Sequence, residues 1–181
     1  MKTPVVIVPY HPEWPRQFEQ ERARLEETFA STKAVIEHIG STAVPGLSAK
    51  PVIDIMIGVA ALSEAEGQIE SLRAQGYEYV PAHEAQLPQR RYFRKPLAEP
   101  RTHHVHCVIP GSSFWQDQLV FRDYLRANPT AAAAYATLKQ DLASRYATDR
   151  EAYSEAKSEF IAGILTHARA GSPFLSNRGH R

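Results

Sequence analysis

The sequence predicts an α/β (α+β) fold, with a mixed sheet followed by a C-terminal helical portion. Strand-like apolar runs alternate with helical segments in residues 1–110, and helical spacing alone follows in residues 111–170. The length of 181 residues suits one domain with a helical extension. We therefore predict a single domain over residues 1–170 and a flexible tail over residues 171–181.

The first half of the chain is predicted to contain three strands and one long helix. Residues 5–8 form a short apolar run that ends at a proline, which is typical of a strand. A helix is expected over 13–30, where aromatic and leucine residues recur at near-helical spacing. A strand over 33–39 leads into a loop rich in Gly, Ser, Thr and Pro over 40–50. Residues 51–59 (PVIDIMIGV) form the strongest strand signal.

The second half changes from mixed elements to helices alone. A helix over 63–74 ends at a glycine, and three further strands are expected at 77–80, 90–95 and 102–109. Helices are expected at 113–127, 129–146 and 150–170, because Asn128-Pro129 and Thr148-Asp149 provide capping and helix-breaking residues between them.

Composition argues against several classes of partner. Lys and Arg total 21 against 20 for Asp and Glu, so no overall charge bias favours a nucleic acid or a membrane surface. Cys107 is the single cysteine, which suits a reducing compartment. No apolar stretch approaches the ~20 residues that span a bilayer. These observations predict a cytoplasmic protein.

Alternation along two strands places polar side chains on one face of the sheet. In residues 51–59, Asp54 lies opposite an unbroken row of isoleucines. In residues 102–109, His104 and His106 lie opposite Val105 and Cys107. A carboxylate and two imidazoles on the same face would bind a divalent metal or move protons. The alternative is a hydrogen-bonded structural aspartate with two solvated histidines.

The loop before Asp54 has the chemistry of a phosphate site. Gly40, Ser41 and Thr42 are small enough for a phosphate to approach the backbone, and successive amides there can form an anion nest. Lys50, at the end of the loop, would neutralise phosphate charge. The same Gly-Ser pair is also common turn chemistry.

Basic residues elsewhere are further candidates for phosphate contacts. Residues 89–95 (QRRYFRK) carry Arg91 and Arg94 among aromatic residues, which suits a nucleotide, although a charged edge strand explains them equally well. Lys157 interrupts an apolar stripe of the last helix. Its side chain either snorkels to solvent or reaches an anion.

These motifs resemble the GrpB family, which is assigned to the nucleotidyltransferase superfamily. The resemblance rests on residues 38–42 (HIGST), 44–47 (VPGL) and 50–55 (KPVIDI). It continues through 91–95 (RYFRK), 104–106 (HVH), 121–125 (FRDYL) and Tyr153-x-x-Ala156-Lys157-x-x-Phe160, and so covers nearly the whole chain. It implies a nucleotidyltransferase-like mixed sheet with packed helices.

The superfamily pattern combines a Gly-Ser pair with two carboxylates, one residue apart on a strand, and a third on a later strand. Gly40-Ser41 and Asp54 match it, but the second position is Met56. The third position falls in the His104–His106 strand. Because thioether sulfur is a poor ligand for Mg²⁺, a pair of Mg²⁺ ions would need other ligands, such as Glu37 or substrate phosphates. A single Mg²⁺, Mn²⁺ or Zn²⁺ ion held by Asp54 and the histidines is easier to assemble.

Two kinds of function follow from the residues and the resemblance. The leading hypothesis is a nucleotidyltransferase-like enzyme acting on a nucleotide or phosphate-containing small molecule with a divalent metal, in which Asp54, His104 and His106 are catalytic and metal-binding. The alternative is a catalytically degenerate nucleotide- or anion-binding module, which Met56 favours. A link to coenzyme A metabolism rests on analogy, because similar domains are fused to dephospho-coenzyme A kinases. Glu37 and His38 are further candidates, since their strand shows no clean alternation.

Overall fold

The computed structural model describes residues 4–171 and contains a five-stranded mixed sheet in the order β1-β2-β5-β4-β3. The central pair β2·β5 is parallel, and the three other pairs are antiparallel. The strands are β1 (Val35–Ile39), β2 (Ile53–Gly58), β3 (Glu78–Tyr79), β4 (Arg90–Lys95) and β5 (His103–Val108). The predicted tail over 171–181 lies outside the described residues, apart from Gly171.

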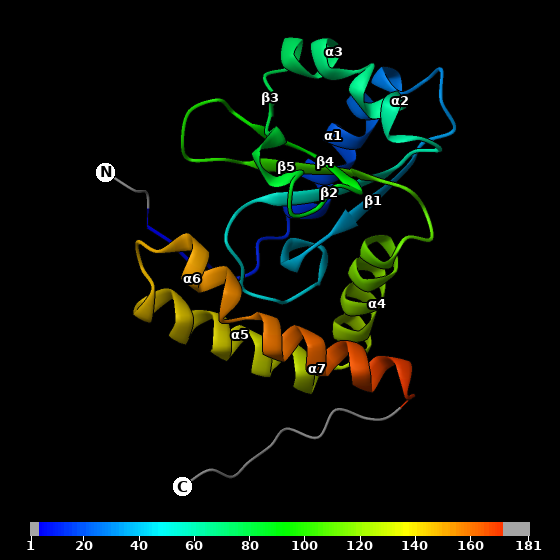
Figure 1. The fold of residues 1–181 in the computed structure, drawn as a ribbon. Helices are drawn as coiled ribbons and strands as arrows, with labels where there is room; N and C mark the ends of the chain where they lie inside the picture. The colour runs from blue at the N-terminus through cyan, green and yellow to red at the C-terminus, as the bar shows by residue number, and fades with distance from the viewer. Residues whose placement is uncertain (1–3, 172–181) are drawn as a thin grey trace, which may run out of the picture.

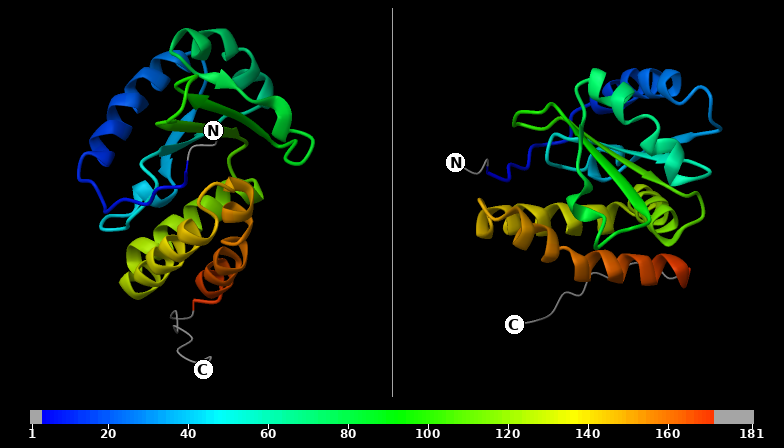
Figure 2. Two further views of the ribbon diagram at one scale, coloured as in Figure 1. Left: turned by 90° about the vertical axis from the view of Figure 1, so that its left-hand side faces the viewer. Right: turned by 45° about the horizontal axis from the view of Figure 1, so that its top comes forward.

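Helices lie on both sides of this sheet, as Figures 1 and 2 show. On one side are α1 (Trp14–Thr28), α2 (Leu62–Glu66) and α3 (Ile69–Ala74). On the other side are α4 (Ser113–Ala127), α5 (Pro129–Arg145), α6 (Arg150–Glu155) and α7 (Ser158–Arg169). Two 3₁₀ turns, η1 (Ser41–Ala43) and η2 (Pro81–His83), complete the described elements. The predicted mixed α/β fold with a C-terminal helical portion is confirmed.

The sheet face toward α1 forms the main apolar core. Ile53, Ile55 and Ile57 of β2 are at most 2% exposed and pack with Val105 and Cys107 of β5. This is the apolar face that alternation predicts. The parallel register of β2 and β5 brings these rows together, and it therefore brings the polar rows together on the other face.

A second core lies between the C-terminal helices and the loop after β1. Tyr135 of α5 packs edge-on against Phe121 of α4 and stacks on Phe160 of α7, with ring centroids 5.3 Å and 5.2 Å away. Val44 and Leu47 of the loop belong to the same cluster. Apolar packing thus holds α5 and α7 against the loop that carries the Gly-Ser pair.

Three predicted elements differ from the structure. Residues 5–8 form an isolated bridge between Val8 and Ala49 rather than a sheet strand, because their backbone bonds go to the loop at Ala49 and to Ala147 in the turn after α5. The helix predicted over 63–74 is divided into α2 and α3 at Gly67, a residue of low helix propensity. The helix predicted over 150–170 is divided into α6 and α7 by a turn at Ala156 and Lys157. Within residues 4–171, we find no helix with the length and hydropathy of a membrane span.

Candidate functional site

A polar pocket of about 670 Å³ lies where the loop after β1 meets the sheet and the C-terminal helices. The loop contributes Ser41, Thr42 and Lys50, and the sheet contributes side chains from β2, β4 and β5. Helices α5 and α6, with the turn after α6, close the other side. The pocket therefore joins segments that are far apart in the sequence.

Asp54 and His104 form a carboxylate–imidazole pair in this pocket. They are register partners on β2 and β5, and Nδ1 of His104 lies 3.0 Å from Oδ1 of Asp54. The Asp54 side chain is 29% exposed, so the carboxylate is open to the pocket. Burial alone would raise the pKa of Asp54, but the His104 hydrogen bond and the electrostatic effects of His104, His106 and Lys157 outweigh it and hold the pKa below its ordinary value.

Gly40 allows the loop to pass directly over this carboxylate. Its φ is 70°, and a Cβ atom built there would lie 2.6 Å from Oδ2 of Asp54. Only glycine accepts both the left-handed backbone and the close approach. The next residues turn into η1, where buried Thr42 donates a 3.2 Å hydrogen bond to the carbonyl of Val52 and so ties the loop to the chain just before β2.

Three lysines from different segments line the pocket. Lys50 ends the loop, Lys139 comes from α5, and Lys157 lies in the turn between α6 and α7. Nζ of Lys139 donates a 2.9 Å hydrogen bond to Oγ of Ser41 and a second bond to the carbonyl of Ser48. Burial and the neighbouring charge of Lys157 lower the pKa of Lys139 to about 7. Burial also lowers the pKa of Lys50 and of Lys157.

The arginines of the pocket wall are already paired with carboxylates. Arg94 and Arg101 both contact Glu78, at 2.9 Å and 2.8 Å. Arg150 makes two hydrogen bonds to Glu99, the shorter of 2.8 Å, and they lower the pKa of Glu99 to about 2. Two further acids, Glu151 and Glu155, line the pocket, and among the described residues Lys50, Lys139 and Lys157 form no ion pair with either.

Among the predicted site residues, the structure brings Ser41, Thr42, Lys50, Asp54, Arg94, His104 and Lys157 to this pocket, with Gly40 against Asp54. It does not bring His106 there. The His106 ring shares the sheet face with His104 but lies between the rings of Tyr92 and Phe114, at 5.0 Å and 5.7 Å, and its Nδ1 faces Arg90. Burial lowers the pKa of His106 to about 3.

Arg91, Glu37 and His38 also lie away from the pocket. Arg91 is on the opposite face of β4 and forms an ion pair of 2.8 Å with Glu66. Glu37 accepts a 2.7 Å hydrogen bond from Arg122 of α4. The His38 ring stacks on Phe18 of α1 with centroids 4.6 Å apart, and burial lowers its pKa to about 4.

In the part of the chain that the structure describes, the side chains around Asp54 do not form a three-ligand metal site. Met56, at the position of the second superfamily carboxylate, is 0% exposed and packs with Ile39 and Val108 under α4. Across residues 4–171, no three His, Cys, Asp or Glu side chains are grouped so that they would hold a metal ion. Of the predicted set of Asp54, His104 and His106, the structure brings the first two within 3.0 Å of each other, and metal binding stays a prediction.

Lys139 lines the pocket but is not marked by any of the sequence motifs, and the same holds for Arg101 and Arg150. Lys139 lies on the buried stripe of α5 with Ala131, Tyr135 and Leu142, and its side chain is 2% exposed. A lysine at helical spacing within an apolar stripe is the same signal that singled out Lys157. Here it was hidden by the surrounding alanines, which by themselves indicate only a good helix former.

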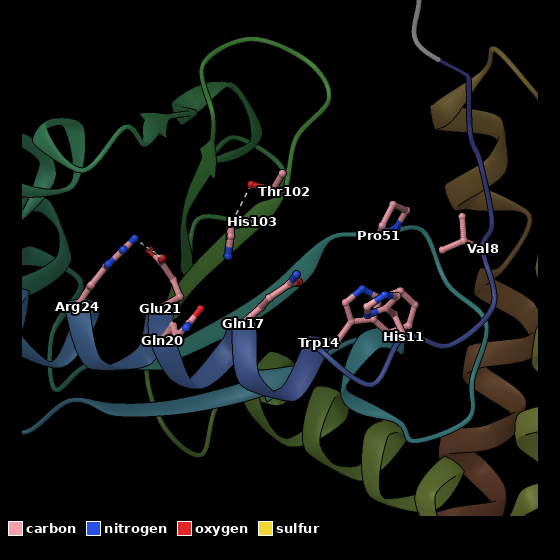
Figure 3. Close-up of a pocket in the computed structure, with 10 residues that line it drawn as sticks. All are labelled: Val8, His11, Trp14, Gln17, Gln20, Glu21, Arg24, Pro51, Thr102 and His103. Atoms are coloured by element: carbon pink, nitrogen blue, oxygen red, sulfur yellow. Dashed lines mark hydrogen bonds and ion pairs between the residues drawn. The ribbon is translucent and has the colours of Figure 1, made fainter.

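A second pocket, of about 470 Å³, lies on the other face of the sheet, between α1 and the start of β5 (Figure 3). Its acid, Glu21, accepts hydrogen bonds from Tyr77 and Lys95 and lies 3.5 Å from Arg24. His103 faces this side, and burial lowers its pKa to about 4. Because its acid is already paired, this pocket offers little charge to a ligand.

The fold and the first pocket define a mixed α/β protein with a polar pocket in which three lysines lie near the Asp54–His104 pair. The chain belongs to the GrpB family, because the family model described as GrpB protein matches residues 4–167. The resemblance found in the sequence is thereby confirmed.

Relatives and a solved structure agree with this assignment. The UPF0157 protein YqkA of Bacillus subtilis is 39% identical over 168 residues, which cover 93% of this chain and 48% of that protein. This chain therefore spans about half the length of YqkA. A dephospho-CoA kinase of Mycolicibacterium paratuberculosis is 35% identical over 189 residues, which cover 92% of this chain and 46% of the kinase. The crystal structure of conserved protein GrpB from Enterococcus faecalis superposes with a TM-score of 0.83 at 36% identity, covering 92% of this chain and 98% of that one.

Proposed function

We propose that this chain binds a nucleotide or another phosphate-containing small molecule in the pocket around Ser41 and Asp54, as a binding module with a nucleotidyltransferase-like fold. The convergence of Lys50, Lys139 and Lys157 on one pocket supports this proposal. Lysine ammonium groups bind phosphate as point charges, and hydroxyl groups add hydrogen bonds. The Gly40–Ser41 turn provides the close backbone approach that a phosphate needs.

Ligand binding is favoured over catalysis because the pocket lacks the second carboxylate that would help to hold metal ions. Metal-dependent nucleotidyl transfer relies on hard oxygen ligands, and here the second carboxylate position is a methionine in the core. Asp54 and His104 are a carboxylate and an imidazole that lie within 3.0 Å of each other in the pocket. The cations from the helices supply positive charge at the place where the superfamily uses metal ions.

Nucleotidyl or phosphoryl transfer is the second candidate, and the Asp54–His104 pair favours it. An imidazole held at 3.0 Å by a carboxylate, at the wall of an open pocket, is suited to proton transfer. The candidate requires turnover that depends on this pair. If Asp54→Ala retained full turnover of a nucleoside triphosphate, the assignment of a catalytic role would be wrong.

A role connected to coenzyme A metabolism is the third candidate. It is favoured by the dephospho-CoA kinase relative, in which the matching part makes up 46% of the protein. Coenzyme A precursors carry phosphate groups, so the same pocket would receive them. Dephospho-coenzyme A therefore belongs in every ligand panel used to test the pocket.

A thermal-shift screen tests the proposal. Nucleoside di- and triphosphates, dephospho-coenzyme A and phosphate-free nucleosides are each combined with EDTA, Mg²⁺, Mn²⁺ or Zn²⁺. We expect stabilisation by a phosphate compound, since a ligand at 100 times its Kd adds about 2.7 kcal/mol to the stability of the folded state. Lys157→Met should lose this stabilisation. Lys33→Met removes the same charge at an exposed position and is the matched control.

The outcomes separate the candidates. Stabilisation without turnover supports the binding module, and turnover that Asp54→Ala abolishes supports transfer. If no phosphate compound stabilises the wild type under any of the four metal conditions, the proposed function is rejected. If Lys33→Met loses stabilisation as strongly as Lys157→Met, the effect reflects net charge and the pocket assignment fails.

A further inference from the structure

Lys139 is a buried cation that has no carboxylate partner among residues 4–171. Its Nζ contacts the Ser41 hydroxyl and the Ser48 carbonyl, and it lies 4.7 Å from the centre of the Tyr135 ring. The residue is 2% exposed. Burying a charge in this way is unfavourable unless an opposite charge compensates it. A bound anion would therefore stabilise the charged form of Lys139.

The charges around it leave a definite surplus. In the described part of the chain, Lys50, Lys139 and Lys157 form no ion pair with an acidic side chain within 4.0 Å. The pocket lining has six basic side chains, Lys50, Arg94, Arg101, Lys139, Arg150 and Lys157, against the carboxylates of Asp54, Glu99, Glu151 and Glu155. Glu78, which binds Arg94 and Arg101, brings the carboxylates to five, so one positive charge remains. A terminal phosphate group carries a charge of about −1.5 to −2 at neutral pH, so it is attracted to lysines that lack an ion pair.

The groups that face Lys139 come from each element packed around it. The 3₁₀ turn and its following loop contribute the neutral Ser41 and Ser48, and α5 contributes Tyr135, whose pKa is raised by burial so that it stays neutral. Lys157, in the turn after α6, is the charged neighbour that acts on Lys139. Because every facing group is neutral or positive, an anion bound here would draw a proton onto the Lys139 amine.

We propose that a terminal phosphate group binds between Ser41, Lys139 and Lys157, that it needs no metal ion, and that its binding is accompanied by proton uptake at Lys139. This inference rests on the proposed function and specifies its ligand and conditions. The lysines supply the countercharge that a metal would otherwise provide, and Ser41 supplies a hydroxyl donor. Because a proton is taken up on binding, the affinity of the site for the anion is high near neutral pH and low in alkaline solution.

Inorganic sulfate and inorganic phosphate are suitable probes, both titrated by calorimetry in EDTA. Sulfate keeps a fixed charge between about pH 7 and pH 9, so any pH dependence of its affinity comes from the protein. We expect the affinity of the wild type for sulfate to fall by up to roughly tenfold for each pH unit above pH 7, because one proton is taken up per anion. Titrations in two buffers of different ionisation enthalpy measure that proton directly.

Two variants and one control locate the effect. Lys139→Met should bind sulfate at least tenfold more weakly near pH 7 and lose the pH dependence, while Lys33→Met should keep the wild-type behaviour. Lys139→Arg should retain binding without proton uptake, because a guanidinium stays charged across this range. Circular dichroism checks that each variant is folded. The pH dependence of sulfate binding by the wild type tests the proposal even if a variant fails to fold.

The failure of this inference differs from the failure of the proposed function. Binding that appears only with Mg²⁺, Mn²⁺ or Zn²⁺ overturns the metal-free site but leaves a phosphate pocket in place. Affinity of the wild type that is constant from about pH 7 to pH 9 overturns the role of Lys139. Absence of binding by all phosphate compounds, with and without metals, removes both proposals together.

Discussion

The buried amine of Lys139 should make the stability of the ligand-free protein depend on pH in a specific way. Its pKa is about 7 in the folded chain, against an ordinary value of 10.5. Below pH 7, both the folded and the unfolded chain hold the proton, so the cost of the buried charge is fully present. Above pH 7, the folded chain releases the proton and the unfolded chain retains it until about pH 10.5. The free energy of unfolding therefore rises with pH in this window.

The size of the effect follows from the width of the window. Each pH unit in which the two states differ by one proton changes the free energy of unfolding by about 1.4 kcal/mol. Between pH 7 and pH 9, allowing for partial protonation at pH 7, Lys139 should add about 2 kcal/mol to the stability of the wild type. Lys139→Met has no such group and should lack this increase.

Urea denaturation of the wild type and of Lys139→Met, at intervals from about pH 6 to pH 9, measures this difference. Groups remote from Lys139 titrate equally in both proteins, so the difference between the two curves reports Lys139 together with its charged neighbour Lys157. Lys33→Met, at an exposed position, shows what removal of a surface lysine does. If the wild-type and Lys139→Met curves stay parallel over the whole range, Lys139 keeps its ordinary pKa in the folded protein and the reasoning is refuted.

Two further predictions concern the backbone and the core beside the pocket. Gly40→Ala should cost more than about 2 kcal/mol of stability in urea denaturation, because its Cβ would lie 2.6 Å from Oδ2 of Asp54 at a φ of 70°. Gly46→Ala has a φ of 78° with no atom within 4 Å of its Cβ, so its cost should stay near 1 kcal/mol, and equal costs would contradict the contact argument. Met56→Asp, which restores the superfamily carboxylate, should cost at least about 3 kcal/mol because that position is 0% exposed, whereas Met56→Leu should cost less than about 1.5 kcal/mol. A well-folded Met56→Asp variant that binds Mg²⁺ would show that the position can turn toward the pocket.

Strand alternation is sufficient to predict that Asp54 and His104 lie on the same face of the sheet. The parallel register of β2 and β5 makes them direct partners. Alternation reports only the face, however, and does not report the position along the strand. His106 shares the face but lies two residues further on, where Tyr92 and Phe114 enclose it. For the same reason, alternation alone could not show whether Asp54, His104 and His106 lie close enough together to bind one metal ion.

The cations were harder to place, because their positions depend on how the helices pack. Arg91 was a candidate from composition alone, and the alternation of β4 turns it to the far side of the sheet, where Glu66 binds it. Lys157 was ambiguous because the helix was expected to be continuous, whereas the turn after α6 places it at the pocket. Lys139 could be assigned to the pocket only with the knowledge that the buried stripe of α5 faces the Gly-Ser loop. That contact is made through Tyr135 and its aromatic neighbours, whose pairing does not follow from local sequence.

The distribution of charge between the sheet and the helices gives Met56 a physical explanation. In a site that holds two metal ions, the sheet must supply several carboxylates, since the cations come from solution. Here the sheet supplies Asp54 to the pocket, and the helical part supplies Lys139 and Lys157 as fixed cations. Under the proposed function, a second carboxylate beside Asp54 would cancel positive charge that would otherwise attract a phosphate. An apolar side chain that packs under α4 is therefore compatible with phosphate binding, and it removes the oxygen ligand that a metal-dependent reaction would need.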